Sequence, residues 1–282
     1  MADAPATPQP EATQSKAGRN LPVAIAAGVV LGGLCIASLA WQKWLFIPLA
    51  VVALWIGITE IANGFATRGI RISTWPLLVA VPVIGWAAYV HGPQAFLAVI
   101  AALVLVILVW RLWGGTEDYV RDTTASVFVA GYIPLMLGFA ILTLRADDGA
   151  WRIVAFIALT IGSDIGGYAA GVLFGKHPMA PTISPKKSWE GFAGSVIFQV
   201  AIGVGLFVTV LSGQWWEGVL AGVILTITAT LGDFIESAVK RDLGIKDMGS
   251  IIPGHGGLMD RLDSLIPNAF VSWAVFTAFL GS

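Results

Sequence analysis

Charged side chains gather near the C-terminal end of the chain, where a long apolar run stops. Four polar residues there are spaced i, i+3, i+4 and i+7: Asp233, Glu236, Ser237 and Lys240. That spacing places them on one face of a helix. Because ionisable groups are costly at membrane depth, they normally mark a site that faces the interior of a helix bundle. Lys240 and Arg241 alone would also fit a solvated helix end, whereas the deeper, acidic Asp233 fits that interpretation poorly.

A glycine-rich loop further along the chain runs directly into another predicted helix. Adjacent Gly256 and Gly257 let backbone N–H groups approach an anion, and a helix N-terminus favours phosphate. Asp260 and Asp263 share a face of the first turn, and paired carboxylates suit Mg²⁺, which bridges to substrate phosphates. Each carboxylate alone could be an ordinary charge at a helix N-terminus. That simpler interpretation does not explain the convergence of His255, Gly256, Gly257, Asp260, Arg261 and Asp263.

A third polar group lies upstream of these two. Asp164 interrupts an apolar run, and a later loop contains Lys186, Lys187 and Ser188. The two lysines and the hydroxyl could bind phosphates, and Ser188 could also cap the helix that follows. Ordinary positive charge that orients the protein in the membrane is the simpler explanation of the lysines.

The composition requires lipid as the solvent for much of the surface. Hydrophobic residues make up 57% of the 282 residues and charged residues only 12%, and the mean hydropathy is +0.82. A soluble domain carries about 25% charged residues. The net charge of −1 alone says nothing about a nucleic-acid partner, and we expect none. A single cysteine excludes a disulfide framework, and three scattered histidines argue against a zinc site.

The hydropathy pattern predicts an all-α polytopic membrane protein with about nine transmembrane helices. Each apolar run is about long enough to cross roughly 30 Å of hydrocarbon as a helix. Residues 1–20 lack any apolar period and are typical of a disordered tail. The expected spans lie near residues 21–40, 44–65, 74–90, 94–112, 123–144, 151–174, 192–212, 216–236 and 264–280.

The distribution of lysine and arginine predicts the orientation. With a cytoplasmic N-terminus, 13 of the 16 basic residues fall on the cytoplasmic side, and Lys43, Arg145 and Arg152 fall on the other. This positive-inside pattern places both motif-bearing loops where soluble nucleotides are found. We therefore expect a cytoplasmic tail, a transmembrane scaffold and a transmembrane catalytic region, over residues 1–20, 21–120 and 121–282.

The motifs together resemble a known family. The segment from Ser237 to Asp263, SAVKRDLGIKDMGSIIPGHGGLMDRLD, resembles the signature of phosphatidate cytidylyltransferases. The upstream Ser163-Asp164 and the segment from Ser184 to Gly191 are also similar to that family. Ser188 stands where threonine is usual, which keeps the hydroxyl, and Gly167 stands where alanine is common. The resemblance covers roughly residues 120–282, because the first four spans match only as apolar helices.

The resemblance implies that CTP and phosphatidate react to give CDP-diacylglycerol and pyrophosphate, with Mg²⁺. It implies a homodimer in the cytoplasmic (inner) membrane with its site on the cytoplasmic side, and it leaves a second, monovalent ion open. The implied metal ligands are Asp233, Asp260 and Asp263, and the groups that neutralise phosphates are Lys240, Arg241 and Arg261. The implied substrate-binding residues are Asp164, Ser184, Lys186, Lys187, Ser188, His255, Gly256 and Gly257.

Two other functions stay open on the sequence. A CTP-dependent lipid kinase of the polyprenol type would use a related nucleotide site, and would transfer the γ-phosphate instead of the cytidylyl group. A transporter of phosphorylated metabolites would line a pathway with the same polar residues. The absence of visible inverted repeats and the gathering of charge on one side argue against a transporter.

Overall fold

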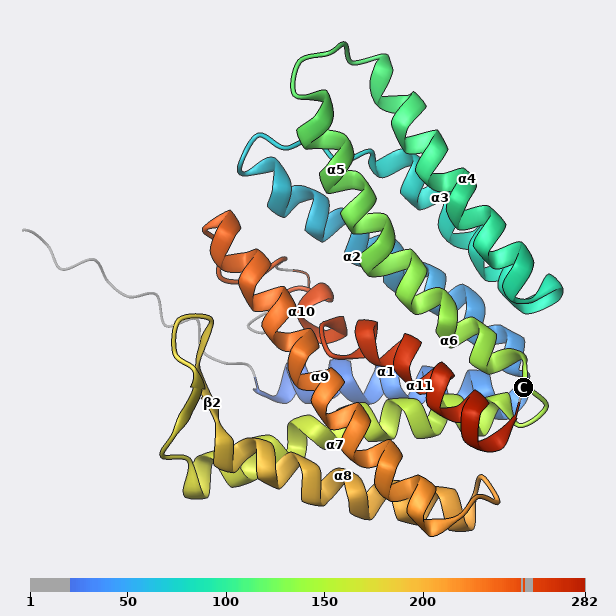
Figure 1. The fold of residues 1–282 in the computed structure, drawn as a ribbon, viewed down its shortest axis with the longest axis vertical. Coiled ribbons are helices and arrows are strands. Elements are labelled where there is room, and N and C mark those ends of the chain that lie inside the picture. Colours follow the sequence, from blue (N-terminus) through green and yellow to red (C-terminus); the bar gives the residue numbers. More distant parts are fainter. Residues whose placement is uncertain (1–20, 250, 252–255, 282) are drawn as a thin grey trace, which may run out of the picture.

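The structure, a computed structural model, describes residues 21–249, 251 and 256–281 (Figure 1). Helices form almost all of it. The N-terminal helices are α1 (Leu21–Trp41), η1 (Lys43–Leu45), α2 (Phe46–Ala66), α3 (Thr74–Trp86), η2 (Ala87–His91), α4 (Pro93–Leu112), α5 (Tyr119–Ala130), η3 (Gly131–Leu135) and α6 (Met136–Arg145). The C-terminal elements are α7 (Gly149–Phe174), β1 (Pro178–Ala180), β2 (Ser184–Ser188), α8 (Trp189–Thr209), α9 (Trp215–Leu243), α10 (Met259–Leu262) and α11 (Leu265–Leu280).

The helices confirm the predicted all-α membrane fold. Eight helical segments of the described chain are long and apolar enough to cross a membrane, and α1, with 21 residues, occupies the first expected span. Two spans contain a π-helical turn beside a proline: η2 follows Pro82 and η3 contains Pro134. A proline removes one helical hydrogen bond and crowds the turn before it, so a local change of helix type is expected around Pro134. The expected disordered tail lies outside the described residues.

The spans pack around two apolar cores. One core is formed by the helices from α2 through α6, by α10 and by the start of α11. It includes the fully buried Ile58 and Phe96. The other core is formed by α1, by the helices from α6 through α9 and by α11. It includes the fully buried Phe207 and Phe276. Figure 1 shows α2 to α5 as one group and α7 to α9 as another, with α11 between them.

Glycines let α8 and α9 approach closely. A Cβ on Gly203 of α8 would lie 2.3 Å from the carbonyl oxygen of Gly218 on α9. A Cβ on Gly222 of α9 would lie 2.7 Å from the carbonyl oxygen of Gln199 on α8. Neither position accepts a larger side chain without a shift of the backbone, as is common where membrane helices pack through small residues. This packing fixes α9, which carries Asp233, Glu236, Lys240 and Arg241.

The basic residues are divided between the two ends of the spans as the charge pattern predicts. We call the end that carries segments 67–73, 113–118 and 175–188 the polar end. There, Arg68 Nε donates to the carbonyl oxygen of Leu243 at 3.0 Å, and the buried Arg111 donates to Asp122 at 3.0 Å. At the opposite end, Lys43 Nζ donates to Ala146 at 2.6 Å and Arg152 donates to Gly281 at 2.6 Å. Which end is cytoplasmic stays a prediction.

Three local features differ from the expectation. Helix α9 continues to Leu243, beyond the expected end of its span, and ends at Gly244 in a left-handed conformation (φ 72°), which favours glycine. Two helices follow the glycine-rich loop where one was expected: α10 ends at Leu262 and α11 starts at Leu265. The expected loop before α8 contains the antiparallel hairpin of β1 and β2.

Candidate functional site

One lysine joins α9 to α10 at the polar end. Lys240 Nζ donates to Glu236 Oε2, one turn earlier on α9, at 2.8 Å. The same ammonium group donates to Asp260 Oδ1 on α10, also at 2.8 Å. Both carboxylates are buried and Lys240 is nearly so. The predicted helical face of α9 therefore does meet the glycine-rich loop, and a single cation holds the two together.

A second lysine reaches the same helix from the hairpin. Lys187 of β2 forms an ion pair with Asp233 of α9, and its ammonium group lies 5.4 Å from the centre of the Phe234 ring. Burial lowers the pKa of Lys187, while the negative charges of Asp164 and Asp263 act in the opposite direction. Lys187 is therefore surrounded by carboxylates from three different segments.

Asp164 and Asp263 complete the cluster. The charge of Asp164, on α7, interacts with those of Asp263, Lys187 and Arg261. The charge of Asp263 also interacts with that of Glu236. We call this set the charged cluster: Asp164, Lys187, Asp233, Glu236, Lys240, Asp260, Arg261 and Asp263. It brings the predicted metal and phosphate residues of α7, α9 and α10 to one place.

The donor set of the cluster fits a divalent cation that arrives with phosphates. Within the described residues, no three His, Cys, Asp or Glu side chains are arranged to hold a metal ion. Mg²⁺ usually needs only one or two carboxylates, with waters and substrate phosphates as its other ligands. Among the described residues, no donor reaches the buried Glu236 Oε1, and the negative charge of Asp263 acts on the same carboxylate. A buried acceptor without a donor is costly, so a cation would stabilise this point.

The three carboxylates that were predicted to bind a metal have protein partners in this structure. Asp233 is paired with Lys187 and Asp260 with Lys240, so lysine ammonium groups neutralise two of the three predicted ligands. Asp263 accepts a hydrogen bond from the Ser264 backbone at 2.8 Å. The assignment of Asp233, Asp260 and Asp263 to a metal stays a prediction.

Asp260 organises the glycine-rich loop from within. Its carboxylate accepts backbone hydrogen bonds from Gly257 at 2.7 Å and from Met248 at 3.0 Å. The Gly257 N–H, predicted to bind a phosphate, donates to Asp260 here. Gly256 has a φ of 82°, which a residue with a side chain adopts only with strain. Glycine at position 256 is thus explained by backbone geometry.

Glu60 on α2 is a residue of the site that the sequence did not reveal. Its side chain is 4% exposed, and it accepts hydrogen bonds from the backbone of Leu258 at 3.1 Å and of Met259 at 2.7 Å. A Cβ on Gly249 or Gly257 would lie 2.3 Å or 2.5 Å from its carboxylate oxygens. Glu60 therefore holds the start of α10, and its carboxylate occupies space that glycine leaves at both positions. The one available signal was an acidic residue inside an apolar span.

Glu60→Gln should slow the reaction, because the glutamine side chain would position the glycine-rich loop less well. The amide keeps one acceptor but turns an NH₂ group towards a backbone N–H, which costs about 1–3 kcal/mol. We expect kcat to fall on the order of tenfold, and we expect the melting temperature to fall with it. The measurement is kcat at saturating substrates together with thermal unfolding in detergent.

Glu217→Gln is the matched control for that variant. Glu217 is a buried carboxylate that accepts a backbone hydrogen bond from Gln214 at 2.7 Å, at the far end of α9. Its replacement should lower the melting temperature and leave kcat unchanged. Equal losses of kcat in both variants would show that Glu60 acts on stability alone.

Several of the other predicted residues are not members of the charged cluster. Ser188 accepts a hydrogen bond from the Gly191 backbone at 3.1 Å, which confirms it as the N-cap of α8. Within the described chain, no hydrogen bond or ion pair joins Lys186 or Arg241 to the cluster, and both side chains are exposed. Ser184 begins β2 opposite Ala180. His255 lies outside the described residues.

Comparisons with known proteins agree with this arrangement. The chain matches the model of the "Cytidylyltransferase family" over residues 22–279. It is 41% identical over 279 residues to a phosphatidate cytidylyltransferase of Mycobacterium leprae, covering 93% of this chain and 89% of that one. Proteins of the same name are similar in Mycobacterium tuberculosis, 41% identical over 283 residues (95% and 86%), and Brucella suis, 30% identical over 259 residues (89% and 91%).

Proposed function

This chain belongs to the cytidylyltransferase family, and we propose that its charged cluster is the active site. The protein is an integral membrane nucleotidyltransferase that makes CDP-diacylglycerol from CTP and phosphatidate. The observation that supports the site is the convergence of Lys187, Lys240 and Asp260 with the other members of the cluster at the polar end.

The reaction needs no nucleophile from the protein. A phosphate oxygen of phosphatidate attacks the α-phosphorus of CTP, a new P–O bond forms, and the bond to the β-phosphate breaks to release pyrophosphate. Catalysis of this kind depends on positioning the two substrates and neutralising their charge. The cluster combines carboxylates and lysines within hydrogen-bond reach of one another, which suits both tasks.

The lysines and carboxylates have complementary roles in this proposal. Mg²⁺ held by Asp233, Asp260 and Asp263 would add positive charge to the phosphates of CTP. Lys187 and Lys240, now paired with those carboxylates, then have ammonium groups available for phosphate oxygens. Arg261 presents a planar guanidinium to the phosphate of the lipid. The carboxylates would then be neutralised by lysine without the metal and by Mg²⁺ with it.

The polar end is proposed to face the cytoplasm of the inner membrane. This end carries the basic residues of segments 67–73 and 175–188, namely Arg68, Arg71, Lys176, Lys186 and Lys187, as the positive-inside pattern requires. CTP is a soluble nucleotide and is found on that side. A homodimer, with no nucleic acid bound, is part of the same proposal.

The fate of the CTP phosphates tests the reaction. Purified protein is incubated with phosphatidate, Mg²⁺ and CTP labelled with ³²P at the α or the γ position. We expect α label in the extracted lipid and γ label in pyrophosphate. Label from the γ position in lipid would indicate a kinase instead. Uptake of a phosphorylated metabolite into vesicles without CTP turnover would indicate a transporter.

Lys186→Ala should weaken substrate binding without slowing the chemical step. Lys186 is exposed on β2 beside the half-buried Lys187, so it contributes a screened attraction of about 1 kcal/mol or less. The apparent KM should rise up to about fivefold at low salt and less at high salt. Lys176→Ala, in the same exposed segment but away from the paired lysines, is the control. An unchanged KM for both CTP and phosphatidate would remove Lys186 from the site.

A further inference from the structure

A tyrosine hydroxyl is buried beside the charged cluster without a hydrogen bond. Tyr132 lies on the π-helical turn η3 and is 9% exposed. Among the described residues, no hydrogen-bond partner reaches its hydroxyl oxygen. Buried tyrosine hydroxyls usually have a partner, because a buried polar group without one destabilises the fold. A hydroxyl in this state marks a place where a water molecule or a ligand binds.

The ring of Tyr132 is held by its neighbours. It stacks on the ring of Phe128, one turn earlier, with the ring centres 5.6 Å apart and the planes 13° apart. Phe128 in turn contacts Phe65 of α2, with the ring centres 6.4 Å apart. The turn η3 also packs against α11, and π-helical turns occur frequently at functional sites. The hydroxyl therefore has a defined position, set by η3 and by two aromatic neighbours.

The hydroxyl faces two carboxylates of the charged cluster. It interacts electrostatically with Glu236 of α9 and with Asp263, which precedes α11. The negative charge of Asp263 acts on Glu236 as well. Glu236 accepts a hydrogen bond from Lys240 with Oε2, whereas no donor of the described chain reaches Oε1. Two oxygens without partners, Tyr132 Oη and Glu236 Oε1, thus lie around Asp263.

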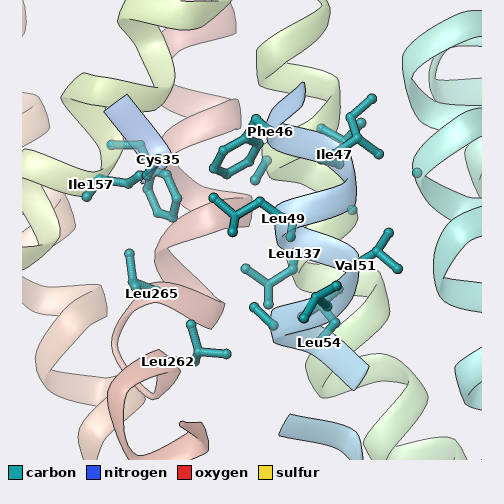
Figure 2. Close-up of a pocket in the computed structure, with 18 of the residues that line it drawn as sticks. Cys35, Phe46, Ile47, Leu49, Val51, Leu54, Leu137, Ile157, Leu262 and Leu265 are labelled. Carbon is teal, nitrogen blue, oxygen red and sulfur yellow. The ribbon is translucent and has the colours of Figure 1, made fainter. Parts of the chain in front are cut away.

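The apolar pocket beside η3 does not supply the missing partner. Figure 2 shows Leu137 and Leu262 among the side chains around this pocket, and Pro134 of η3 also lines it. Tyr132 is not among the residues that line it. Leu262 therefore faces the pocket, while the next residue, Asp263, interacts with Tyr132. The hydroxyl is directed to the charged side of this turn.

The charges around the hydroxyl favour a hydrated cation as its partner. The charged cluster contains five carboxylates and three cationic side chains, so an anion beside Glu236 and Asp263 would be repelled. Mg²⁺ keeps several of its waters in protein sites, and a water on a cation donates hydrogen bonds. A tyrosine oxygen and a carboxylate oxygen both accept such bonds. One water on the cation can therefore satisfy both oxygens that lack a partner.

We propose that Tyr132 is a positioning residue for the divalent cation of the active site: its hydroxyl and Glu236 Oε1 hold a water molecule that the cation carries. The inference rests on the proposed function, because it adds a residue to the proposed metal site. Tyr132 acts through the water and touches neither substrate. Its hydroxyl hydrogen stays available to a carboxylate, so the group is satisfied both as acceptor and as donor.

Tyr132→Phe tests the proposal, because it removes the hydroxyl and keeps the stacked ring. Mn²⁺ is titrated by electron paramagnetic resonance in the presence of CTP and without phosphatidate, against a protein-free blank. We expect Mn²⁺ to bind about tenfold more weakly than to the wild type. Without metal, the melting temperature should equal or exceed that of the wild type, since phenylalanine leaves no unpaired hydroxyl in the core. A merely structural role would not produce this combination.

Tyr119→Phe is the matched control. The Tyr119 hydroxyl donates to the carbonyl oxygen of Leu108 at 3.0 Å, between α5 and α4. Its loss should lower the melting temperature slightly and leave the Mn²⁺ affinity unchanged. In activity assays, Tyr132→Phe should need about tenfold more Mg²⁺ for half-maximal rate. Its KM for CTP at saturating Mg²⁺ should match the wild type, which assigns the loss to the metal rather than to the nucleotide.

A double-mutant cycle with Glu236→Gln tests the shared water. If Tyr132 and Glu236 hold the same water, Tyr132→Phe should change the Mn²⁺ affinity of the Glu236→Gln protein by less than about threefold. A loss of about tenfold in both backgrounds would contradict the shared water. Equal Mn²⁺ affinities of the wild type and Tyr132→Phe would remove Tyr132 from the metal site. A wild type that binds no Mn²⁺ would refute the proposed metal site and this inference with it, and that result is read from the wild type alone.

Discussion

Asp260→Asn should lose nearly all cytidylyltransferase activity, by about 10³-fold or more in kcat. The wild-type carboxylate accepts backbone hydrogen bonds from Gly257 and Met248 and neutralises Lys240. An asparagine would turn an NH₂ group towards one of these donors, and it would remove the charge of a carboxylate that we propose as a ligand of a divalent cation. The measurement is transfer of α-labelled cytidylyl to lipid by the purified variant, with Mg²⁺ varied.

The span pattern should survive that substitution. Asp260 lies at the end of a membrane segment, so the loss of its charge does not lessen the apolar character of α11. Asp242→Asn, an exposed carboxylate near the end of α9, should keep full activity and serves as the control. Wild-type activity in Asp260→Asn, with the protein extracted from membranes as usual, would contradict the assignment of the site.

Lys240→Met should have the second largest effect, and it should act on stability as well as activity. The ammonium group of Lys240 lies between Glu236 and Asp260, both buried. Its removal leaves two buried carboxylates without a cation, which typically costs about 3–5 kcal/mol. We expect a marked fall in melting temperature and a loss of activity of at least about 10²-fold.

Added Mg²⁺ separates the two roles of Lys240. A divalent cation can replace the missing positive charge, so it should restore part of the melting temperature of Lys240→Met. It cannot replace an ammonium group that contacts a phosphate, so activity should stay low. Lys240→Arg, which keeps the charge, should keep most of the stability. If Mg²⁺ restored full activity to Lys240→Met, Lys240 would be a structural residue only.

The span pattern could be predicted from the sequence because the bilayer imposes it. Backbone polar groups have no water to bind in hydrocarbon, so each apolar run must form a complete helix. The span expected near 44–65 is Lys43–Ala66, and the one expected near 94–112 is Pro93–Leu112. Charged and turn residues end these runs, so their bounds are well marked in the sequence.

The polar end could not be predicted with the same precision. Helix α9 continues to Leu243 because Glu236 and Lys240 pair along one face and find Asp260 opposite. Hydropathy gives no indication of such tertiary partners. The short strands β1 and β2 are also too short and too polar to have a periodicity of their own.

Most members of the charged cluster were named from the sequence, but their partners were not. Spacing placed Asp233 and Lys240 on one face of α9, and the structure brings that face to Asp260 and Lys187. Sequence alone could not indicate that Lys187 pairs with Asp233. Glu60 contacts Leu258 across 198 residues of sequence, and only the packing of α2 against α10 reveals it.

The most direct test of the central claim is a measurement of metal binding at the cluster. Mn²⁺, which suits the oxygen ligands that Mg²⁺ prefers, can be titrated by electron paramagnetic resonance into purified protein with CTP and no phosphatidate. The account predicts protein-bound Mn²⁺ in the wild type and in Asp242→Asn, and an affinity at least about tenfold weaker in Asp263→Asn. Equal Mn²⁺ affinity in all three proteins would contradict a metal-dependent reaction at this cluster.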